Sequence, residues 1–165
     1  MNKITKACNF YVSEWHLFAA LLPYLKNQLK EKNKIVIISQ DNLKNGIEEL
    51  VKKIDIKFEN ENGLGDISWL NENFMLEIKD EYSPINIIVR GTLEFITDIN
   101  KYLKDNLEIV YRNLTIINCY EVFDTNNMLY NILDEHQFVF NTGGMHEKNE
   151  IFPGYKSSEK AELAK

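Results

Sequence analysis

The sequence contains few of the residues that build disulfide frameworks, metal centres or membrane spans. Its 165 residues include only two cysteines and three histidines. No histidine lies three or four residues from another histidine or from a cysteine, the spacing that a compact metal site favours. No apolar run approaches the roughly 20 residues that span a bilayer. We therefore expect a cytoplasmic protein with no metal site and no membrane segment.

A phosphate-binding loop is also missing. Nucleotide-hydrolysing α/β proteins carry a G-x-x-x-x-G-K-[ST] loop after a strand, where backbone amides and a lysine hold the phosphates. The turn after the first expected strand reads FYVSEW at residues 10–15, without glycine or lysine and with an added carboxylate. We expect neither ATP nor GTP to bind there, and we expect no cofactor.

The charge balance argues against direct contact with nucleic acid. The chain has 25 acidic and 19 basic residues and a formal net charge of -6, which repels phosphate backbones. Hydrophobic residues make up 44% of the chain and charged residues 27%, as in folded globular proteins. The length suits one domain, which we place at residues 1–155, followed by a charged, flexible tail at residues 156–165.

Strand-like and helix-like segments alternate along the chain. The branched apolar runs at residues 35–38 and 85–89 are typical of strands buried on both faces. Other strands are expected at residues 4–11, 114–120 and 137–140, with helices beginning near Glu14, Asp41, Leu93 and either Asp124 or Thr125. Residues 55–82 are irregular, and we expect a short strand, a polar loop and a short helix there. This alternation predicts an α/β fold with a mostly parallel central sheet and helices on both faces.

The carboxyl ends of the expected strands carry the candidate ligand-binding residues. Open α/β sheets bind ligands in the crevice at this edge. Because parallel strands end on the same edge, we expect Arg90, Tyr11 and Tyr120 to surround one crevice. The full candidate set is Tyr11, Ser39, Arg90, Glu94, Tyr120 and Glu121.

Arg90 has two interpretations in the sequence. A guanidinium at the strand end can face a ligand, or it can form a structural ion pair with Glu94, Glu108 or Glu121. His136 is expected at the end of a helix, where its positive charge would complement the helix C-terminus.

Both cysteines are expected to be inert. Cys8 and Cys119 lie in apolar, strand-like runs, where a thiol behaves as a small buried hydrophobe. A redox pair would require that their strands be neighbours and that the two Cα atoms lie within about 7 Å of each other.

Three segments, in order, resemble the MEDS domain family, a sensory domain named for methanogens, methylotrophs and a dichloromethane-responsive repressor. They are NFYVSEWHLFAALLPYLKNQLKEKNKIVIIS, INIIVRGTLEFI and IINCYEVFDTNNMLYNILDEHQFVFNTGG. The family's histidine before the first strand is replaced by Ala7 and Cys8, and its glutamate after the strand-end glycine by Thr92. The resemblance implies a RecA/KaiC-like three-layer sandwich without a phosphate loop, and a sensory role.

The leading hypothesis is therefore a stand-alone, non-catalytic signalling domain that binds a small organic ligand, a partner protein or both. The alternative is a protein-interaction regulator that binds no ligand. A third hypothesis is a hydrolase with Glu94 or Glu121 as its base. The sequence does not specify the ligand, the partner or the oligomeric state.

Overall fold

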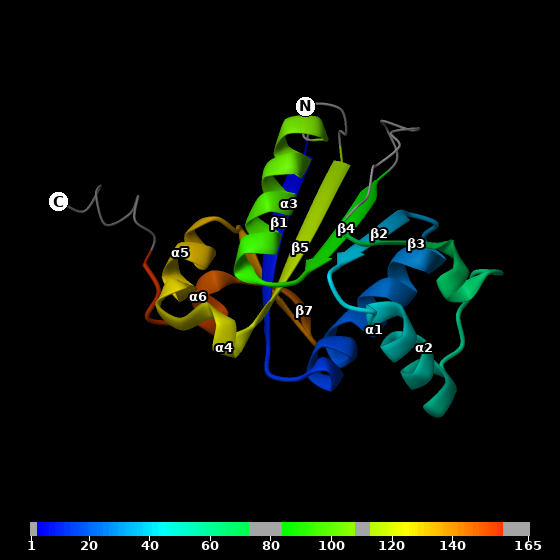
Figure 1. The fold of residues 1–165 in the computed structure, drawn as a ribbon. Helices are drawn as coiled ribbons and strands as arrows, with labels where there is room; N and C mark the ends of the chain where they lie inside the picture. Colours follow the sequence, from blue (N-terminus) through cyan, green and yellow to red (C-terminus); the bar gives the residue numbers. More distant parts are fainter. Residues whose placement is uncertain (1–2, 73–83, 108–112, 157–165) are drawn as a thin grey trace.

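Seven strands form one sheet at the centre of the molecule (Figure 1). The computed structural model describes residues 3–72, 84–107 and 113–156. The strand order is β3-β2-β4-β5-β1-β6-β7, and every neighbouring pair is parallel except the antiparallel pair β6 and β7. The strands are β1 (Lys3–Tyr11), β2 (Lys34–Ser39), β3 (Ile67–Leu70), β4 (Ile85–Arg90), β5 (Asn113–Glu121), β6 (Phe138–Asn141) and β7 (Gly144–Glu147).

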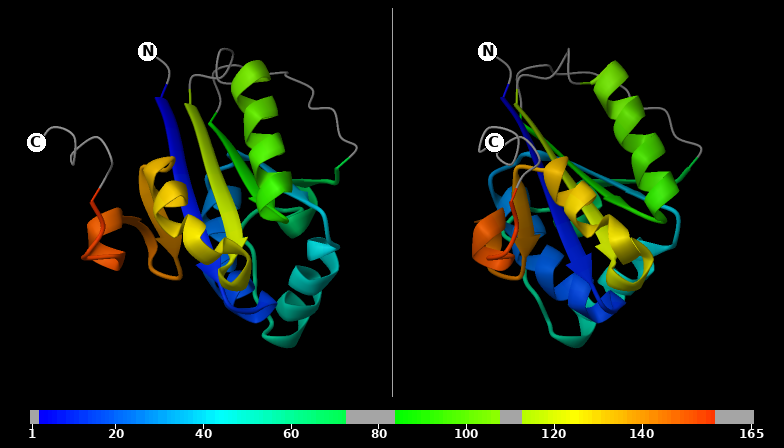
Figure 2. Two further views of the ribbon diagram at one scale, coloured as in Figure 1. Left: turned by 60° about the vertical axis from the view of Figure 1, so that its left-hand side comes forward. Right: turned by 90° about the vertical axis from the view of Figure 1, so that its left-hand side faces the viewer.

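Helices cover both faces of the sheet, which confirms the predicted fold class (Figures 1 and 2). The long helices α1 and α2 pack on one face, which we call the α1 face. Helices α3 and α5 pack on the opposite face, the α3 face, where α6 also contributes. The helices are α1 (Glu14–Lys30), α2 (Leu43–Lys53), α3 (Leu93–Asn106), α4 (Val122–Thr125), α5 (Leu129–Asp134) and α6 (Lys148–Ile151), with 3-10 turns η1 (Gly63–Asp66) and η2 (Asn126–Met128).

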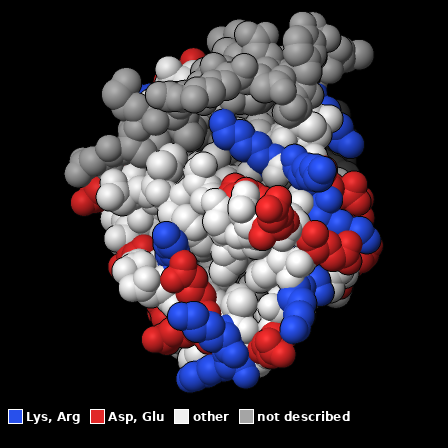
Figure 3. All heavy atoms as spheres, turned by 90° about the vertical axis from the view of Figure 1, so that its right-hand side faces the viewer, with Lys and Arg blue, Asp and Glu red and all other residues white. Residues whose placement is uncertain are grey.

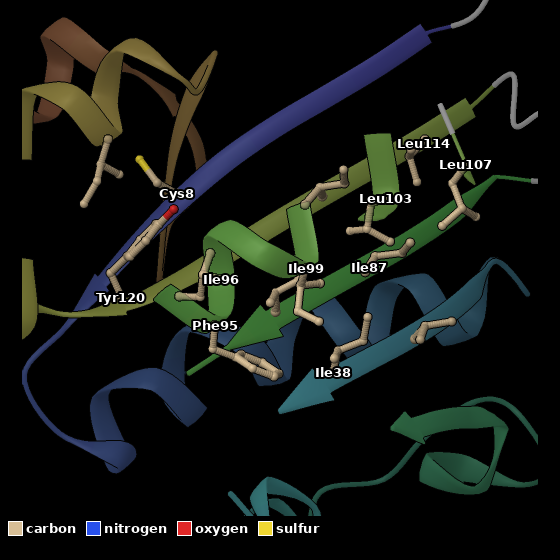
Figure 4. Close-up of a cluster of buried hydrophobic side chains, with 14 of the residues drawn as sticks. Cys8, Ile38, Ile87, Phe95, Ile96, Ile99, Leu103, Leu107, Leu114 and Tyr120 are labelled. Atoms are coloured by element: carbon tan, nitrogen blue, oxygen red, sulfur yellow. The ribbon is translucent and has the colours of Figure 1, made fainter. Parts of the chain in front are cut away.

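The central strands are buried on both faces, as their continuous apolar runs predict. All six residues of β4 are buried, and so are five of the six residues of β2. Because successive side chains of a strand point to opposite faces, Ile35 and Ile37 face α1 whereas Val36 and Ile38 face α3. Figure 4 shows Ile38 and other strand side chains packed beneath α3. The core is therefore two apolar layers separated by one sheet.

The predicted start of α1 is confirmed, whereas the predicted start of the helical region after β5 is wrong. Ser13 caps α1, and its hydroxyl accepts a hydrogen bond from the His16 amide at 3.3 Å. After β5, however, neither Asp124 nor Thr125 caps a helix, because helical backbone begins directly at Val122 and the Thr125 hydroxyl donates to the Val122 carbonyl at 2.7 Å.

Other parts of the prediction were incomplete. Within residues 55–82, the structure describes η1 and the edge strand β3, and the expected short helix falls outside the described residues. The antiparallel strand β7 and the short helix α6 were not expected from the sequence. Among the described residues, none of the helices is long and apolar enough to cross a membrane.

The turn from β4 to α3 is too crowded for any side chain at Gly91. A Cβ atom built there would overlap the Phe95 ring and would lie 2.6 Å from the side-chain oxygen of Gln40. Neither neighbour is free to move, because Phe95 is buried and the Gln40 oxygen accepts a hydrogen bond from the Thr92 amide at 2.8 Å. The glycine thus fixes how closely α3 follows the strand that ends in Arg90.

We predict that Gly91→Ala lowers the free energy of unfolding by about 1–3 kcal/mol, the usual cost of overpacking. The matched control is Gly154→Ala, because a Cβ atom at Gly154 meets no atom within 4 Å. Urea denaturation of both variants and of the wild type measures the difference. Equal midpoints for the two variants would show that the turn adapts without cost.

Candidate functional site

The carboxyl ends of four parallel strands bring polar side chains to one edge of the sheet. The strand register pairs Ser39 with Arg90, Arg90 with Cys119, and Tyr11 with Glu121. Ser39, Arg90 and Tyr11 point to the α1 face, where α1 and α2 begin. This edge contains most of the residues that the sequence analysis selected.

Arg90 is buried at this edge and is held by protein groups. Its side chain is 8% exposed, and its Nε donates a hydrogen bond to the Tyr11 hydroxyl at 3.1 Å. Its Nη2 atom lies 3.1 Å from Oε1 of Glu14 and 3.9 Å from Oδ2 of Asp41. The guanidinium also lies over the Tyr11 ring, 5.4 Å from its centroid. Arg90 therefore connects the end of β1 to the starts of α1 and α2.

The carboxylate partners of Arg90 differ from those expected. Glu94 is exposed on α3, which covers the opposite face of the sheet. Glu121 lies at the end of β5 beside Tyr11, but the salt bridges of Arg90 within the described part of the chain go to Glu14 and Asp41. Glu108 lies outside the described residues. The expected ion pair with Glu94 or Glu121 was wrong, because Glu14, the first residue of α1, and Asp41, two residues before α2, reach the guanidinium instead.

Tyr120 does not share a crevice with Arg90 and Tyr11. Its ring belongs to the core of the α3 face, where it stacks on Phe10 at 5.9 Å and meets His136 edge-on at 5.9 Å. The register places Cys119 beside Arg90, so the next residue of the strand must point to the other side. The expectation of one crevice lined by all three residues was therefore wrong for Tyr120.

A cavity opens beside this edge, between the ends of β2 and β3 and the first turn of α2. Its volume is about 310 Å³. The Ser39 hydroxyl and the Trp69 indole nitrogen, both from residues that line it, are buried without a hydrogen-bond partner among the described residues. The lining residues are Ile37, Ser39, Gln40, Asp41, Asn42, Leu43, Lys44, Trp69, Leu70 and Asn71.

The unpaired groups near this edge are mainly hydrogen-bond donors. The indole N–H of Trp69 can only donate, and a serine hydroxyl can donate or accept. The Nη1 atom of Arg90, next to Ser39 in the register, is likewise buried and unpaired within the described chain. A buried polar atom without a partner costs free energy, so such a cluster favours a ligand that brings acceptor atoms. Ser39 was among the ligand-binding residues predicted from the sequence. Trp69 was not, because β3 is a short edge strand inside an irregular segment.

We predict different stability effects for the two sides of the Arg90 ion pair. Arg90→Ala should lower the free energy of unfolding by about 2–3 kcal/mol, because it leaves a cavity and an unpaired Tyr11 hydroxyl. Glu14→Gln should cost less than about 1 kcal/mol, because water solvates an exposed side chain after the pair is lost. Denaturant titration of both variants measures the difference. Similar losses would show that the ion pair itself, and not the burial of Arg90, dominates.

A second polar network lies inside the α3 face and is complete. The side-chain amides of Asn100 and Asn118 exchange two hydrogen bonds, at 2.7 and 3.0 Å. His136 is 3% exposed, and its Nδ1 lies 2.6 Å from the Ile132 carbonyl while its Nε2 lies 2.9 Å from Asn118 Nδ2. Since a carbonyl only accepts, Nδ1 carries the proton and Nε2 accepts from Asn118.

Burial keeps His136 neutral. Desolvation lowers the pKa of the imidazole to about 4. From the sequence, we expected His136 to carry a positive charge at this helix end. That expectation was wrong, because the ring does contact a terminal carbonyl of α5, but from inside the core, where the charged form is disfavoured.

We predict that the free energy of unfolding falls as the pH decreases from about 6.5 to about 4. The reason is that the pKa of His136 is higher in the unfolded chain than in the folded protein, so over this range only the unfolded chain binds the proton. The loss should reach about 3 kcal/mol relative to His136→Gln, which removes the titrating group. Urea titrations at several pH values compare the two proteins. His16→Gln serves as the control because it replaces an exposed histidine instead of a buried one.

The two cysteines offer no nucleophile. Cys8 faces the α3 side and Cys119 the α1 side, so neighbouring strands do not bring their sulfur atoms together. Both are free and buried, and desolvation raises the pKa of each thiol to about 12. Among the described residues, no group of three or more His, Cys, Asp or Glu side chains is placed to hold a metal ion.

Comparison with protein families, with curated proteins and with solved structures found no match to this chain. The resemblance to the MEDS family therefore stays a prediction.

Proposed function

We propose that this chain is a non-catalytic regulatory domain that binds a small organic ligand in the cavity at the ends of β2 and β3. One observation carries the proposal: residues lining a cavity of about 310 Å³ hold two buried polar atoms, on Ser39 and Trp69, without partners in the described chain. A ligand that brings a carboxylate or carbonyl oxygen to either atom would supply an acceptor that the described chain does not. An aromatic or aliphatic body would contact Ile37, Leu43 and Leu70.

The surroundings of the cavity favour a neutral or singly charged ligand over a nucleotide. Lys44 and the first turn of α2 favour negative charge, but Asp41 lies on the same wall. The acidic and basic side chains on the side of the molecule that carries α2 are interspersed around uncharged surface (Figure 3). This mixture lacks the concentrated positive charge that a triphosphate requires.

The regulatory part of the proposal depends on the MEDS resemblance and on the lack of an activated nucleophile at the site. Glu94 lies on the far face of the sheet, and the Cys119 thiol on the near face is buried and protonated. Two free, buried cysteines suit a reducing compartment, so we place the protein in the cytoplasm.

A second candidate function is a protein-interaction regulator. Several large apolar side chains are exposed, including Phe123 at 70% and Trp15 at 52%. Exposed apolar side chains that cluster are typical of contact surfaces. This function and ligand binding are compatible in one signalling domain.

We predict that Ser39→Ala and Trp69→Phe each weaken ligand binding without destabilising the protein, because each removes a polar atom that has no partner among the described residues. Ligand-detected NMR with acetate, benzoate, succinate, benzamide and inorganic phosphate is the primary assay. At least one organic acid should bind the wild type with a Kd below about 1 mM, and thermal shifts should follow the affinity.

The matched control is Ser68→Ala, because Ser68 is the exposed neighbour of Trp69 on the same strand and does not line the cavity. It should bind like the wild type. Binding that survives both cavity variants would place the ligand elsewhere. Binding of magnesium ATP or GTP with a Kd below about 100 μM would contradict the class of ligand.

A further inference from the structure

A second hollow lies between α1 and the C-terminal end of α2, and it is lined almost entirely by apolar side chains. Its volume is about 460 Å³. Trp15 and Ile54 on its walls are 52% and 56% exposed. Leu22, Pro23, Leu50 and Ile56 complete the apolar lining. We call this hollow the α1/α2 groove.

The groove follows from the spacing of residues on the two helices. On α1, Trp15, Ala19 and Leu22 lie at positions i, i+4 and i+7, so they form one stripe. The small side chain of Ala19 leaves space between its two large neighbours. Trp15 is 52% exposed because this stripe continues past the edge of the core.

A close contact holds the two helices together beside the groove. A Cβ atom on Gly46 of α2 would lie 2.6 Å from the tip of the buried Phe18 ring of α1. Gly46 therefore lets the helices approach at this point. The two walls of the groove are thus positioned by the core and do not need a ligand to form.

Two lysines flank the groove, although the whole chain carries a net charge of -6. Lys26 lies in the lining, and the ammonium of Lys53 lies 5.6 Å from the centroid of the Trp15 ring. Neither lysine forms a salt bridge with another residue in the described ranges. An apolar groove flanked by two such lysines complements an apolar stripe flanked by carboxylates.

We propose that the α1/α2 groove binds an amphipathic helix of an acidic partner protein. Apolar side chains at positions i, i+4 and i+7 of that helix fill the groove, and flanking glutamates or aspartates reach Lys26 and Lys53. A hollow fits an inserted helix better than a flat lipid surface. The net negative charge of the chain also opposes docking on anionic membranes. The proposal concerns a different site from the ligand cavity and does not depend on that cavity being occupied.

The test is selection from a displayed library of helical peptides that share an apolar stripe and vary the flanking residues between Glu, Lys and Ser. Selected peptides should be acidic, and fluorescence anisotropy with labelled copies gives their affinities. Ile54→Glu should weaken binding by at least about tenfold, as for a central contact in an interface. The double variant Lys26→Glu, Lys53→Glu should weaken it by about tenfold at low salt and remove its salt dependence.

The matched control is Phe123→Ser, which removes an exposed apolar side chain outside the groove lining and should leave affinity unchanged. All four substituted positions are on the surface, and thermal denaturation verifies that each variant folds. The absence of selected peptides, or selected peptides that are basic or that bind Ile54→Glu equally well, would overturn the proposal.

Two further measurements distinguish other occupants. A blue shift of tryptophan emission with phosphatidylserine vesicles, absent in Trp15→Phe, would assign the groove to a lipid surface and overturn the proposal. A dimer seen by sedimentation and abolished by Ile54→Glu would assign it to a second copy of the chain and overturn it as well. A monomer that ignores vesicles and binds acidic helices supports it. Failure here leaves the ligand cavity unaffected, because the two sites share no lining residue.

Discussion

The carboxyl edge of the sheet depends on the contacts that the buried guanidinium of Arg90 makes. A positive charge can be buried only if hydrogen bonds and opposite charges replace its water. Here they come from Tyr11 at the end of β1 and from Glu14 at the start of α1, with Asp41 before α2 slightly farther away. Arg90 therefore contacts the first residue of α1 and a residue just before α2. The ligand cavity lies beside this edge, and Asp41 belongs to its lining.

Two groups of buried polar side chains, one on each face of the sheet, differ in how completely their hydrogen bonds are satisfied. On the α3 face, the network of Asn100, Asn118 and His136 is neutral, and each of its donors has an acceptor. On the α1 face, the charged Arg90 coexists with atoms of Ser39 and Trp69 that have no hydrogen-bond partner among the described residues. A complete hydrogen-bond network adds rigidity and specifies packing, whereas an incomplete network leaves polar atoms that a ligand can bind. The proposed ligand cavity lies on the α1 face, and Ser39 and Trp69 both line it.

The sequence predicted the fold class because its signals are local and strong. Branched apolar runs identified β2 and β4, and the alternation with helices required parallel strands. The pairing of Arg90 was not predictable in the same way, since Glu14 is 76 residues away and meets it only through the strand order. Tyr120 was assigned to the wrong face for a related reason. Strand periodicity is readable from the sequence, but the register that places Cys119 beside Arg90 is not. No pattern in the sequence indicates that the indole nitrogen of Trp69 is buried without a partner among the described residues, because an indole in a short edge strand is usually paired or exposed.

Helix α2 physically connects the two proposed sites. Its first turn lines the ligand cavity and its last turn lines the α1/α2 groove, and its 11 residues separate these ends by roughly 16 Å. A ligand alters the groove only if it binds one position of α2 more tightly than another. The contact between Gly46 and Phe18 prevents α2 from moving closer to α1 at this point. Any coupling must also be reciprocal, so a helix that fills the groove changes ligand affinity by the same factor. A domain with this geometry can transmit a binding event through one rigid element, without rearranging the sheet.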